Sequence, residues 1–240
     1  YTTAYQTEKD SFYVTVGLWQ AGQNRIFIDC NVQSPAEMLS PGRIGMTAIL
    51  PVRFTAMNWY GKGPLETYPD RQCGGRMGVY SEDVRNQPFY LRPQEYGLHM
   101  ESRSMRLTDP DRADFVQFEA ACSMAMSAVP YSDLQLWNAR HPYELPAPEA
   151  LYVHLDYAHR GLGNSSCGPD ALPAYRIDGR PCRFGFALEA GLGEREDNPF
   201  GPIPEEIPAY HPWKAVEEQD RTPSYRDPSD PDQRSNAGMV

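Results

Sequence analysis

Short apolar runs with a period of two residues recur along this chain, and glycine- and proline-rich segments separate them. The run RIFIDCNV, Arg25 to Val32, is typical, because every second residue from Ile26 onward is apolar. Such spacing places the apolar side chains on one face of a β-strand. With 19 glycines and 23 prolines to interrupt these runs, the pattern favours an all-β antiparallel sandwich or barrel over alternating βαβ units.

Seven segments carry strand signals of this kind. They are Phe12–Trp19, Arg25–Val32, Gly45–Phe54 with an interruption at Pro51, Asp114–Ala128, Leu151–Asp156, Ala174–Asp178 and Cys182–Leu188. The first two flank a short glycine-containing turn and are expected to form a hairpin. In the fourth, Cys122 is expected to face the same way as Val116 and Phe118. One short helix is expected at Ser132–Ala139, where Ser132 is a suitable N-cap.

The last 50 residues differ in composition from the rest of the chain. Residues 191–240 contain 8 prolines, 11 acidic residues and 5 basic residues, and hydrophobic residues are sparse. Such a segment cannot bury enough apolar surface to offset the cost of ordering its backbone. We therefore expect a sandwich over residues 1–190 and an irregular or disordered tail over residues 191–240.

Charge and cysteine content argue against several classes of function. Lys and Arg number 22 and Asp and Glu number 32, so the net charge is −10, which suits neither nucleic acid nor an anionic membrane as a partner. No apolar run approaches the roughly 18 residues of a transmembrane helix. The five cysteines show no close pairing and predict free thiols in a reducing compartment such as the cytoplasm. His154 and His159 would face opposite sides of a regular strand, so no metal site is expected there.

The segment LYVHLDYAHRGLGNSSCGP, residues 151–169, joins a strand pattern to a glycine-rich loop. The loop carries one thiol, Cys167, which follows Asn164, Ser165 and Ser166. A thiol among small residues suits the wall of a binding site. A buried structural cysteine beside a turn is the commoner case, and the residues alone leave both interpretations open.

Four side chains suggest a sugar cleft: Tyr60, Glu66, Arg92 and Glu95. Aromatic rings can stack on the C–H faces of sugars, although aromatic residues beside glycine and proline more often pack onto the fold. Of two neighbouring strand residues, Trp59 is the better core candidate and Tyr60 the better surface candidate.

The carboxylates of this region allow a second interpretation. A retaining glycosidase needs two carboxyl groups about 5–5.5 Å apart, and Glu66, Asp70, Glu95 and Glu101 lie close in sequence order. We favour the alternative, in which these carboxylates accept hydrogen bonds from loop amides and pair with arginines. On this interpretation the segment contains no catalytic residue.

Three motifs occur in a specific order along the chain. They are NWYGKGPLETYPDR at residues 58–71, FYLRPQEYGLHMESRSMRLTD at residues 89–109, and the segment at residues 151–169; SAVPYSDLQLWNARHPYELP at residues 127–146 also falls in register. Over about residues 1–188 the chain thereby resembles the C-terminal domain, or small chain, of the β-galactosidases of glycoside hydrolase family 2. Tyr96 and Tyr143 depart from the family, in which Asn and His are usual. The family domain starts further upstream, so the first third of the domain is expected to be missing.

The resemblance implies an antiparallel β-supersandwich of the galactose mutarotase type. It implies the C-terminal domain of an oligomeric, retaining enzyme that hydrolyses terminal β-D-galactosides such as lactose, with magnesium and sodium in the parent enzyme and no cofactor in this segment. The catalytic glutamates of the family lie in a separate barrel domain or large subunit, so this segment alone should be inactive. Cys167, with Asn164, Ser165 and Ser166 as loop-shaping residues, would then form part of the wall for the leaving-group sugar.

Two alternatives remain beside this interpretation. A stand-alone carbohydrate-binding or mutarotase-like module would bind galactose as a free chain. A purely structural assembly domain would make no contact with sugar.

Overall fold

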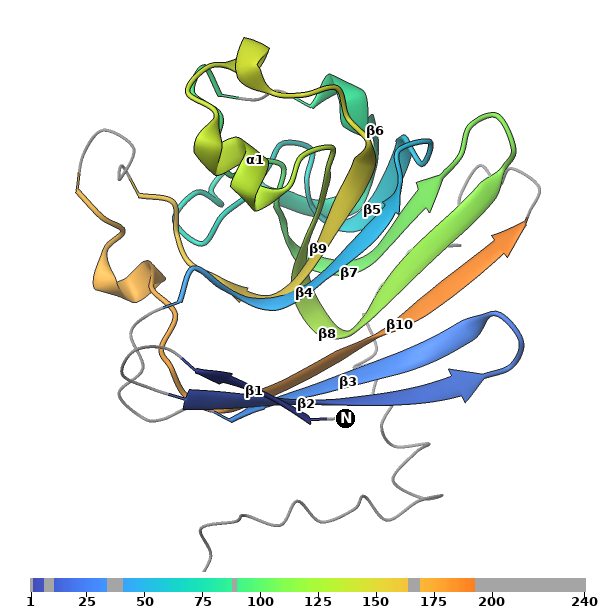
Figure 1. Ribbon diagram of the computed structural model, residues 1–240, viewed down its shortest axis with the longest axis horizontal. Helices are drawn as coiled ribbons and strands as arrows, with labels where there is room; N and C mark the ends of the chain where they lie inside the picture. The colour runs from blue at the N-terminus through green and yellow to red at the C-terminus, as the bar shows by residue number, and fades with distance from the viewer. Residues whose placement is uncertain (1, 7–10, 34–40, 88–89, 164–168, 193–240) are drawn as a thin grey trace, which may run out of the picture. The chain divides into compact units, whose positions relative to one another are not determined.

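The computed structural model describes residues 2–6, 11–33, 41–87, 90–163 and 169–192. Ten strands dominate this part of the chain (Figure 1): β1 (Thr2–Gln6), β2 (Ser11–Ala21), β3 (Arg25–Gln33), β4 (Arg43–Pro51), β5 (Ala56–Gly63), β6 (Arg76–Asp83), β7 (His99–Thr108), β8 (Asp114–Val129), β9 (Ala150–His159) and β10 (Cys182–Leu192). One α-helix, α1 (Asp133–Asn138), and three short 3-10 helices (Val84–Asn86, Pro142–Glu144 and Pro173–Tyr175) connect them. The expected tail over residues 191–240 lies outside the described residues, except for the end of β10.

All strand pairs are antiparallel, and the main hydrogen-bonded order is β1-β2-β3-β10-β8-β7-β5-β6. The pair β4-β9 branches from this path, because β9 pairs with β8 as well. Figure 1 shows β4 and β9 lying above the layer formed by β1, β2, β3 and β10. The expected antiparallel β-sandwich is therefore confirmed.

The long strand β8 makes the branch possible. Its first part, Asp114–Ala120, pairs with β10, whereas its last part, Ala125–Val129, pairs with β9. Between them the burial pattern changes phase, so that Ala120 and Ala121 are both buried and Cys122 is exposed. The prediction that Cys122 faces the same way as Phe118 was wrong, because an irregularity in the strand shifts every later side chain to the other face.

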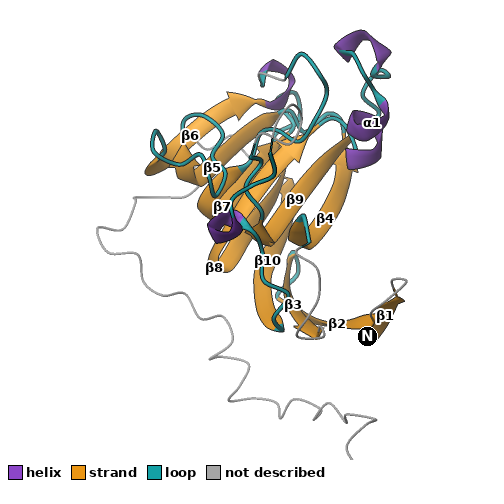
Figure 2. Ribbon diagram, turned by 90° about the vertical axis from the view of Figure 1, so that its left-hand side faces the viewer, coloured by secondary structure: helices purple, strands orange, loops and turns teal. Residues whose placement is uncertain are grey.

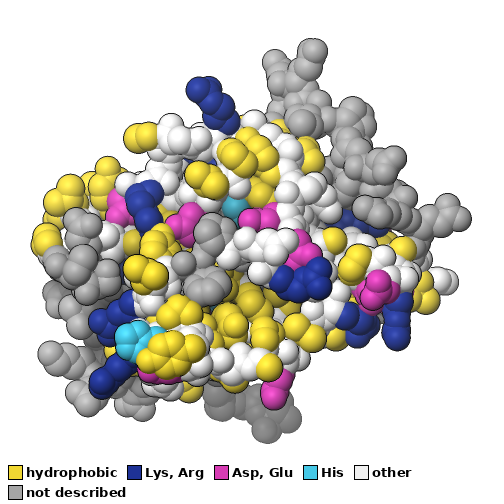
Figure 3. Space-filling model, turned by 90° about the horizontal axis from the view of Figure 1, so that it is seen from above, with side chains coloured by type: hydrophobic (Ala, Val, Ile, Leu, Met, Phe, Trp, Pro, Cys, Tyr) yellow, Lys and Arg dark blue, Asp and Glu magenta, His cyan; other side chains and the backbone are white. Residues whose placement is uncertain are grey.

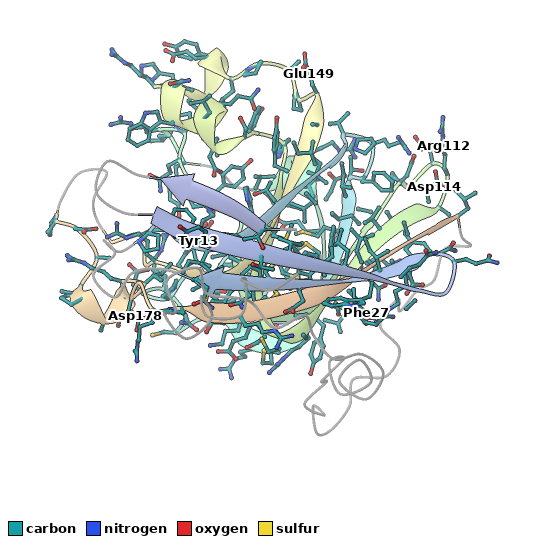
Figure 4. The ribbon with its side chains drawn as sticks, turned by 60° about the horizontal axis from the view of Figure 1, so that its bottom comes forward. Tyr13, Phe27, Arg112, Asp114, Glu149 and Asp178 are labelled. Carbon is teal, nitrogen blue, oxygen red and sulfur yellow. The ribbon has the colours of Figure 1, made fainter. Side chains whose placement is uncertain are left out.

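The hydrophobic core fills the space between the layers. It includes Val16, Ile28 and Cys30 from one layer and Met57, Trp59, Met105, Leu107, Phe118, Leu151, Val153 and Leu155 from the other strands. The Cys30 Sγ atom of β3 lies 3.2 Å from the Met46 Sδ atom of β4, a direct contact between layers. Figure 4 views the β1–β3 layer from below, with Tyr13 of β2 and Phe27 of β3 labelled.

Most of the sequence-predicted elements are present. β2 and β3 form the expected hairpin around Gly22, whose φ of 72° suits glycine. The helix is confirmed, and Ser132 and Gln135 form a capping box at its N-terminus. Trp59 is buried and Tyr60 only half-buried, as predicted.

Other elements differ from prediction. β4 begins at Arg43 and ends at Pro51, where proline removes a backbone donor. The predicted strand Ala174–Asp178 was wrong, since Pro173 starts a 3-10 helix there. The strand that contains Trp59 and Tyr60 extends over Ala56–Gly63 as β5, which the seven expected segments do not include because two glycines weaken its strand signal. An added Cβ would come within 2.6 Å of Ser102 Oγ at Gly61 and of Tyr80 Cδ2 at Gly63, so close packing requires both glycines.

Substitution of Phe118 tests the core. Phe118 is fully buried and its ring centroid lies 6.3 Å from that of Phe186 on the neighbouring strand. We expect Phe118→Ala to lower the free energy of unfolding by about 3–5 kcal/mol, because it removes apolar contacts and leaves a cavity. Denaturant titration measures this change. Ile49→Ala, at a position 65% exposed, is the control and should change the free energy by less than about 1 kcal/mol.

Candidate functional site

A polar cavity of about 670 Å³ lies beside α1 and the loop that follows β9. We call it the arginine pocket, and it is lined by Gly42, Arg43, Arg71, Tyr90, Arg92, Pro93, Gln94, Glu95, Asp133, Leu136, Trp137, His159, Arg160, Gly161, Leu162 and Gly163. Helix α1 lies above β4 and β9 in two perpendicular views (Figures 1 and 2). Loops from three sequence motifs therefore meet at this end of β4 and β9.

The end of β9 brings three polar side chains to one face. In the register with β4, Ile44 opposes Ala158 but Gly45 opposes Asp156, so Tyr157 is an extra residue. This bulge reverses the alternation, and His154, Asp156 and His159 are all buried while Tyr157 is exposed. The prediction that His154 and His159 face opposite sides was wrong, because it assumed a regular strand.

The glycine opposite the bulge is required by close approach. A Cβ on Gly45 would lie 2.3 Å from Asp156 Oδ1 and 2.5 Å from the Leu155 carbonyl oxygen. A residue with a side chain would therefore displace the Asp156 carboxyl group. Gly45 thus allows a buried carboxyl group to lie directly under β4.

Arg43 lies at the centre of a partly buried ion cluster, which we define as Arg43, Glu95, Asp133, His154, Asp156 and His159. The Arg43 guanidinium donates to Glu95, lies 3.7 Å from Asp133 Oδ1 and lies 3.8 Å from Asp156 Oδ2. Tyr68 Oη is 3.4 Å from the other Glu95 oxygen. One arginine therefore compensates carboxyl groups from a loop, a helix and a strand.

Burial shifts the pKa values of two of these carboxyl groups upward. Desolvation raises the pKa of Asp156 to about 8 and that of Glu95 to about 7, against the opposing effect of Arg43. Neither Asp156 oxygen has a hydrogen-bond partner within the described part of the chain. Near neutral pH, both carboxyl groups are therefore protonated in part of the molecules.

The two histidines of the cluster are held in the neutral form. Desolvation by burial lowers the pKa values of both His154 and His159 to about 4. His159 Nδ1 is 2.7 Å from the Arg160 carbonyl oxygen, so this nitrogen donates and Nε2 carries the lone pair. That Nε2 atom lies 3.8 Å from Glu95 Oε1. His154 Nδ1 contacts Thr47 Oγ1 at 3.0 Å.

The first residues of the glycine-rich loop are anchored by Asp70. Its Oδ1 and Oδ2 atoms accept hydrogen bonds from the backbone amides of Leu162 and Gly163, at 3.1 and 2.6 Å. Gly161 donates to the Tyr175 carbonyl oxygen at 2.7 Å, and a Cβ there would lie 2.7 Å from Asp70 Cγ. The YPDR motif therefore fixes the start of the loop that carries Cys167. This confirms the expectation that Asp70 binds loop amides.

The structure divides the predicted sugar cleft. Arg92 and Glu95 line the arginine pocket, whereas Glu66 lines a separate cavity of about 270 Å³ with Leu65, Gln87 and His99. Tyr60 lines neither cavity.

The other carboxylates have partners of the kind expected. Glu66 accepts from the Gly97 amide at 2.8 Å and from the Tyr90 hydroxyl, and lies 3.6 Å from Arg71. Glu101 pairs with Lys62 at 2.6 Å.

The predicted wall residues Cys167, Asn164, Ser165 and Ser166 lie outside the described residues, and their role stays a prediction. Within the described ranges, no three His, Cys, Asp or Glu side chains are arranged to hold a metal ion. No described helix is long and apolar enough to cross a membrane.

Sequence reasoning missed most of the ion cluster and one wall of the pocket. Arg43 and Asp133 are distant in sequence from Glu95, and only the tertiary fold brings them together. Trp137 was assigned only to a helix, yet its side chain is 84% exposed at the pocket. A signal in the sequence could have indicated this wall. Trp137 follows Leu134 and Leu136 on a short expected helix, which cannot bury all three apolar side chains.

The pH dependence of stability tests the ion cluster. From pH 6.5 to 8, folded Asp156 and Glu95 retain protons that the unfolded chain, with ordinary pKa values of 3.8 and 4.5, has already released. Because the folded state then binds more protons, its free energy of unfolding falls as the pH rises. Between pH 4 and 6.5, His154 and His159 have the opposite effect, since the unfolded chain binds their protons. The decline should therefore be clearest above pH 6.5.

Asp156→Asn should remove roughly 1–2 kcal/mol of the decline between pH 6.5 and 8. Denaturant titrations across this range measure the slope. Asp178→Asn is the control, since Asp178 is exposed and pairs with Arg180. Equal slopes for the wild-type chain and Asp156→Asn would contradict the assignment of the proton to Asp156.

Comparison with known proteins identifies the family. The model of the family described as "Beta galactosidase small chain" matches residues 1–188. A β-galactosidase from Staphylococcus xylosus is 32% identical over 148 residues, which are 61% of this chain and 15% of that protein. The β-galactosidase BgaC of Bifidobacterium adolescentis is 37% identical over 123 residues, 50% of this chain and 12% of that protein.

A galactose mutarotase-like protein from Lactobacillus casei has a TM-score of 0.35 and 10% identity, with 80% of this chain and 68% of that chain covered. A score this low carries no conclusion about this chain. The chain spans less than a fifth of the length of the two β-galactosidases named above. The match over residues 1–188 shows that the chain belongs to the β-galactosidase small chain family.

Proposed function

We propose that this chain is the non-catalytic C-terminal domain of a retaining β-galactosidase that hydrolyses terminal β-D-galactosides. In this proposal the glycine-rich loop after β9 completes the substrate pocket, with Cys167 on the side of the leaving-group sugar. The observation that carries it is the anchoring of Leu162 and Gly163 by Asp70, because a loop that forms a pocket wall must be held in position.

The partner in this proposal is a catalytic barrel domain or large subunit. Glu66 and Glu95 line different cavities, and each is engaged by an arginine. A retaining mechanism needs two carboxyl groups facing one scissile bond, so these two do not form the required pair. The catalytic carboxylates would come from the partner.

Free thiols support a reducing location. Cys30, Cys73, Cys122 and Cys182 are all unpaired in the described part of the chain. Disulfides are rare in the cytoplasm, which we therefore propose as the location. An oligomeric parent enzyme without nucleic-acid or membrane partners stays part of this proposal.

The alternative of a stand-alone carbohydrate-binding or mutarotase-like module has one observation in its favour. The arginine pocket combines an exposed tryptophan with several polar side chains, as sugar sites do. Galactose binding by the 240-residue chain alone would favour the module. A domain with only an assembly role would show neither sugar binding nor an effect on kinetics.

The 240-residue chain alone should not hydrolyse a chromogenic β-galactoside, because Glu66 and Glu95 line different cavities and the catalytic pair would come from the partner. Release of the chromophore by the purified chain measures this directly. Turnover that survives purification and disappears in Glu66→Gln or Glu95→Gln would contradict the proposal.

Loss of the loop anchor should change substrate affinity in the intact enzyme. We expect Asp70→Ala to raise KM for a disaccharide about tenfold with kcat within about twofold, because two amide hydrogen bonds to a carboxylate are lost. Cys167→Trp should also act mainly on KM. Cleavage of an activated aryl galactoside should change less in both variants, because the loop would touch the leaving-group sugar.

Steady-state kinetics with both substrates make this comparison. Asp178→Ala is the matched control, since its exposed carboxylate lies outside the loop anchor. If the Asp70→Ala enzyme has a lower melting temperature but an unchanged KM, Asp70 contributes only to stability.

A further inference from the structure

The arginine pocket has the dimensions and the lining of a small-molecule site. Its volume of about 670 Å³ falls in the range of known ligand pockets, and its walls come from α1, the loop at residues 90–95 and the loop after β9. The proposed function assigns no ligand to this pocket. The side chains of the lining indicate which ligand the pocket could bind.

One wall of the pocket offers an aromatic platform. On α1, Leu136 is buried whereas its neighbour Trp137 is 84% exposed. A large exposed indole beside polar groups is suited to the C–H face of a sugar ring. Nearby, the Tyr90 hydroxyl is already engaged by Arg71 and Glu66, so this second ring is held in place.

The lining is positively charged on a strongly acidic chain. Four arginines, Arg43, Arg71, Arg92 and Arg160, face the pocket against two carboxylates, Glu95 and Asp133. The chain as a whole carries a net charge of −10. Figure 3, which looks down on the end that carries α1, shows basic and acidic side chains interspersed with hydrophobic ones.

Three of these arginines are already paired. Arg43 pairs with Glu95, Arg160 lies 2.5 Å from Asp170, and Arg71 lies 3.6 Å from Glu66. Arg92 is exposed at the pocket, and no ion pair joins it to any other described residue. Its guanidinium group is therefore available to an anion, for which arginine offers two parallel donors.

We propose that the arginine pocket is an accessory site for a sugar that carries a carboxylate or a phosphate. The sugar ring stacks on Trp137 and the anionic group pairs with Arg92. Gln94, which also lines the pocket, can bind a ring hydroxyl. This inference goes beyond galactoside hydrolysis and does not depend on it.

Direct binding to the intact protein that contains this chain tests the proposal. The probes are galacturonate, galactose 6-phosphate, galactose and inorganic phosphate, measured by calorimetry at low salt. We expect at least one of the two anionic sugars to bind about tenfold or more tightly than galactose and phosphate, because a charge-assisted hydrogen bond is added to ring stacking. Which of the two binds identifies the anionic group. The preference should weaken with added salt.

Two variants assign the contacts. Arg92→Gln should remove the preference for the anionic sugar over galactose. Trp137→Ala should lower the affinity for the anionic sugar about tenfold. The controls are Arg180→Gln and Leu134→Ala, both exposed and outside the pocket lining, and both should bind like the wild-type protein.

Three results would overturn the proposal. They are no binding of either anionic sugar, a preference that persists in Arg92→Gln, and inorganic phosphate binding as tightly as the anionic sugar that binds best. Binding is measured without turnover. The binding result therefore stands even if the chain is shown not to belong to a β-galactoside-hydrolysing enzyme.

Discussion

Arg43 lies among three carboxyl groups that come from separate parts of the chain: Glu95 from a loop, Asp133 from α1 and Asp156 from β9. Their negative charge offsets part of the cost of removing the guanidinium group from water. Replacement of Arg43 by a neutral residue would raise the pKa values of Glu95 and Asp156 further, because Arg43 is the cation that opposes their desolvation. The end of β4, the helix and the end of β9 are thus held together by one cation, and the arginine pocket lies where they meet.

Two irregular strands make this arrangement possible. The change of phase in β8 lets its last residues pair with β9 instead of β10, which creates the second layer. The bulge at Tyr157 then turns His159 to the same face as Asp156. A regular β9 would send His159 away from Glu95. The fold therefore uses departures from strand periodicity to gather polar groups that a regular sheet would separate.

Sequence periodicity predicted the hairpin of β2 and β3 and the capped helix because local residues determine both. It failed at β5, where Gly61 and Gly63 suppress the strand signal although neighbouring side chains require them. It also failed at His159. One inserted residue turns every later side chain to the opposite face of the strand, and the amino-acid composition does not reveal the insertion. Arg92 and Glu95 were found as site candidates from their motif. Arg43 was not, because its partners are distant in sequence and come from a loop, a helix and a strand that only the tertiary fold brings near.

The anchoring of the loop after β9 links the fold to the proposed function. Asp70 belongs to the turn after β5, and its two hydrogen bonds fix the backbone of Leu162 and Gly163 from within this chain. A pocket wall contributes to binding only if its position is set before the ligand arrives, since ordering it on binding would reduce affinity. Because the anchor and the strand that leads into the loop belong to the same unit, the start of the loop is set without help from a partner. The arginine pocket shares Gly161 and Leu162 with that loop, so a ligand bound there would touch the same backbone that Asp70 holds.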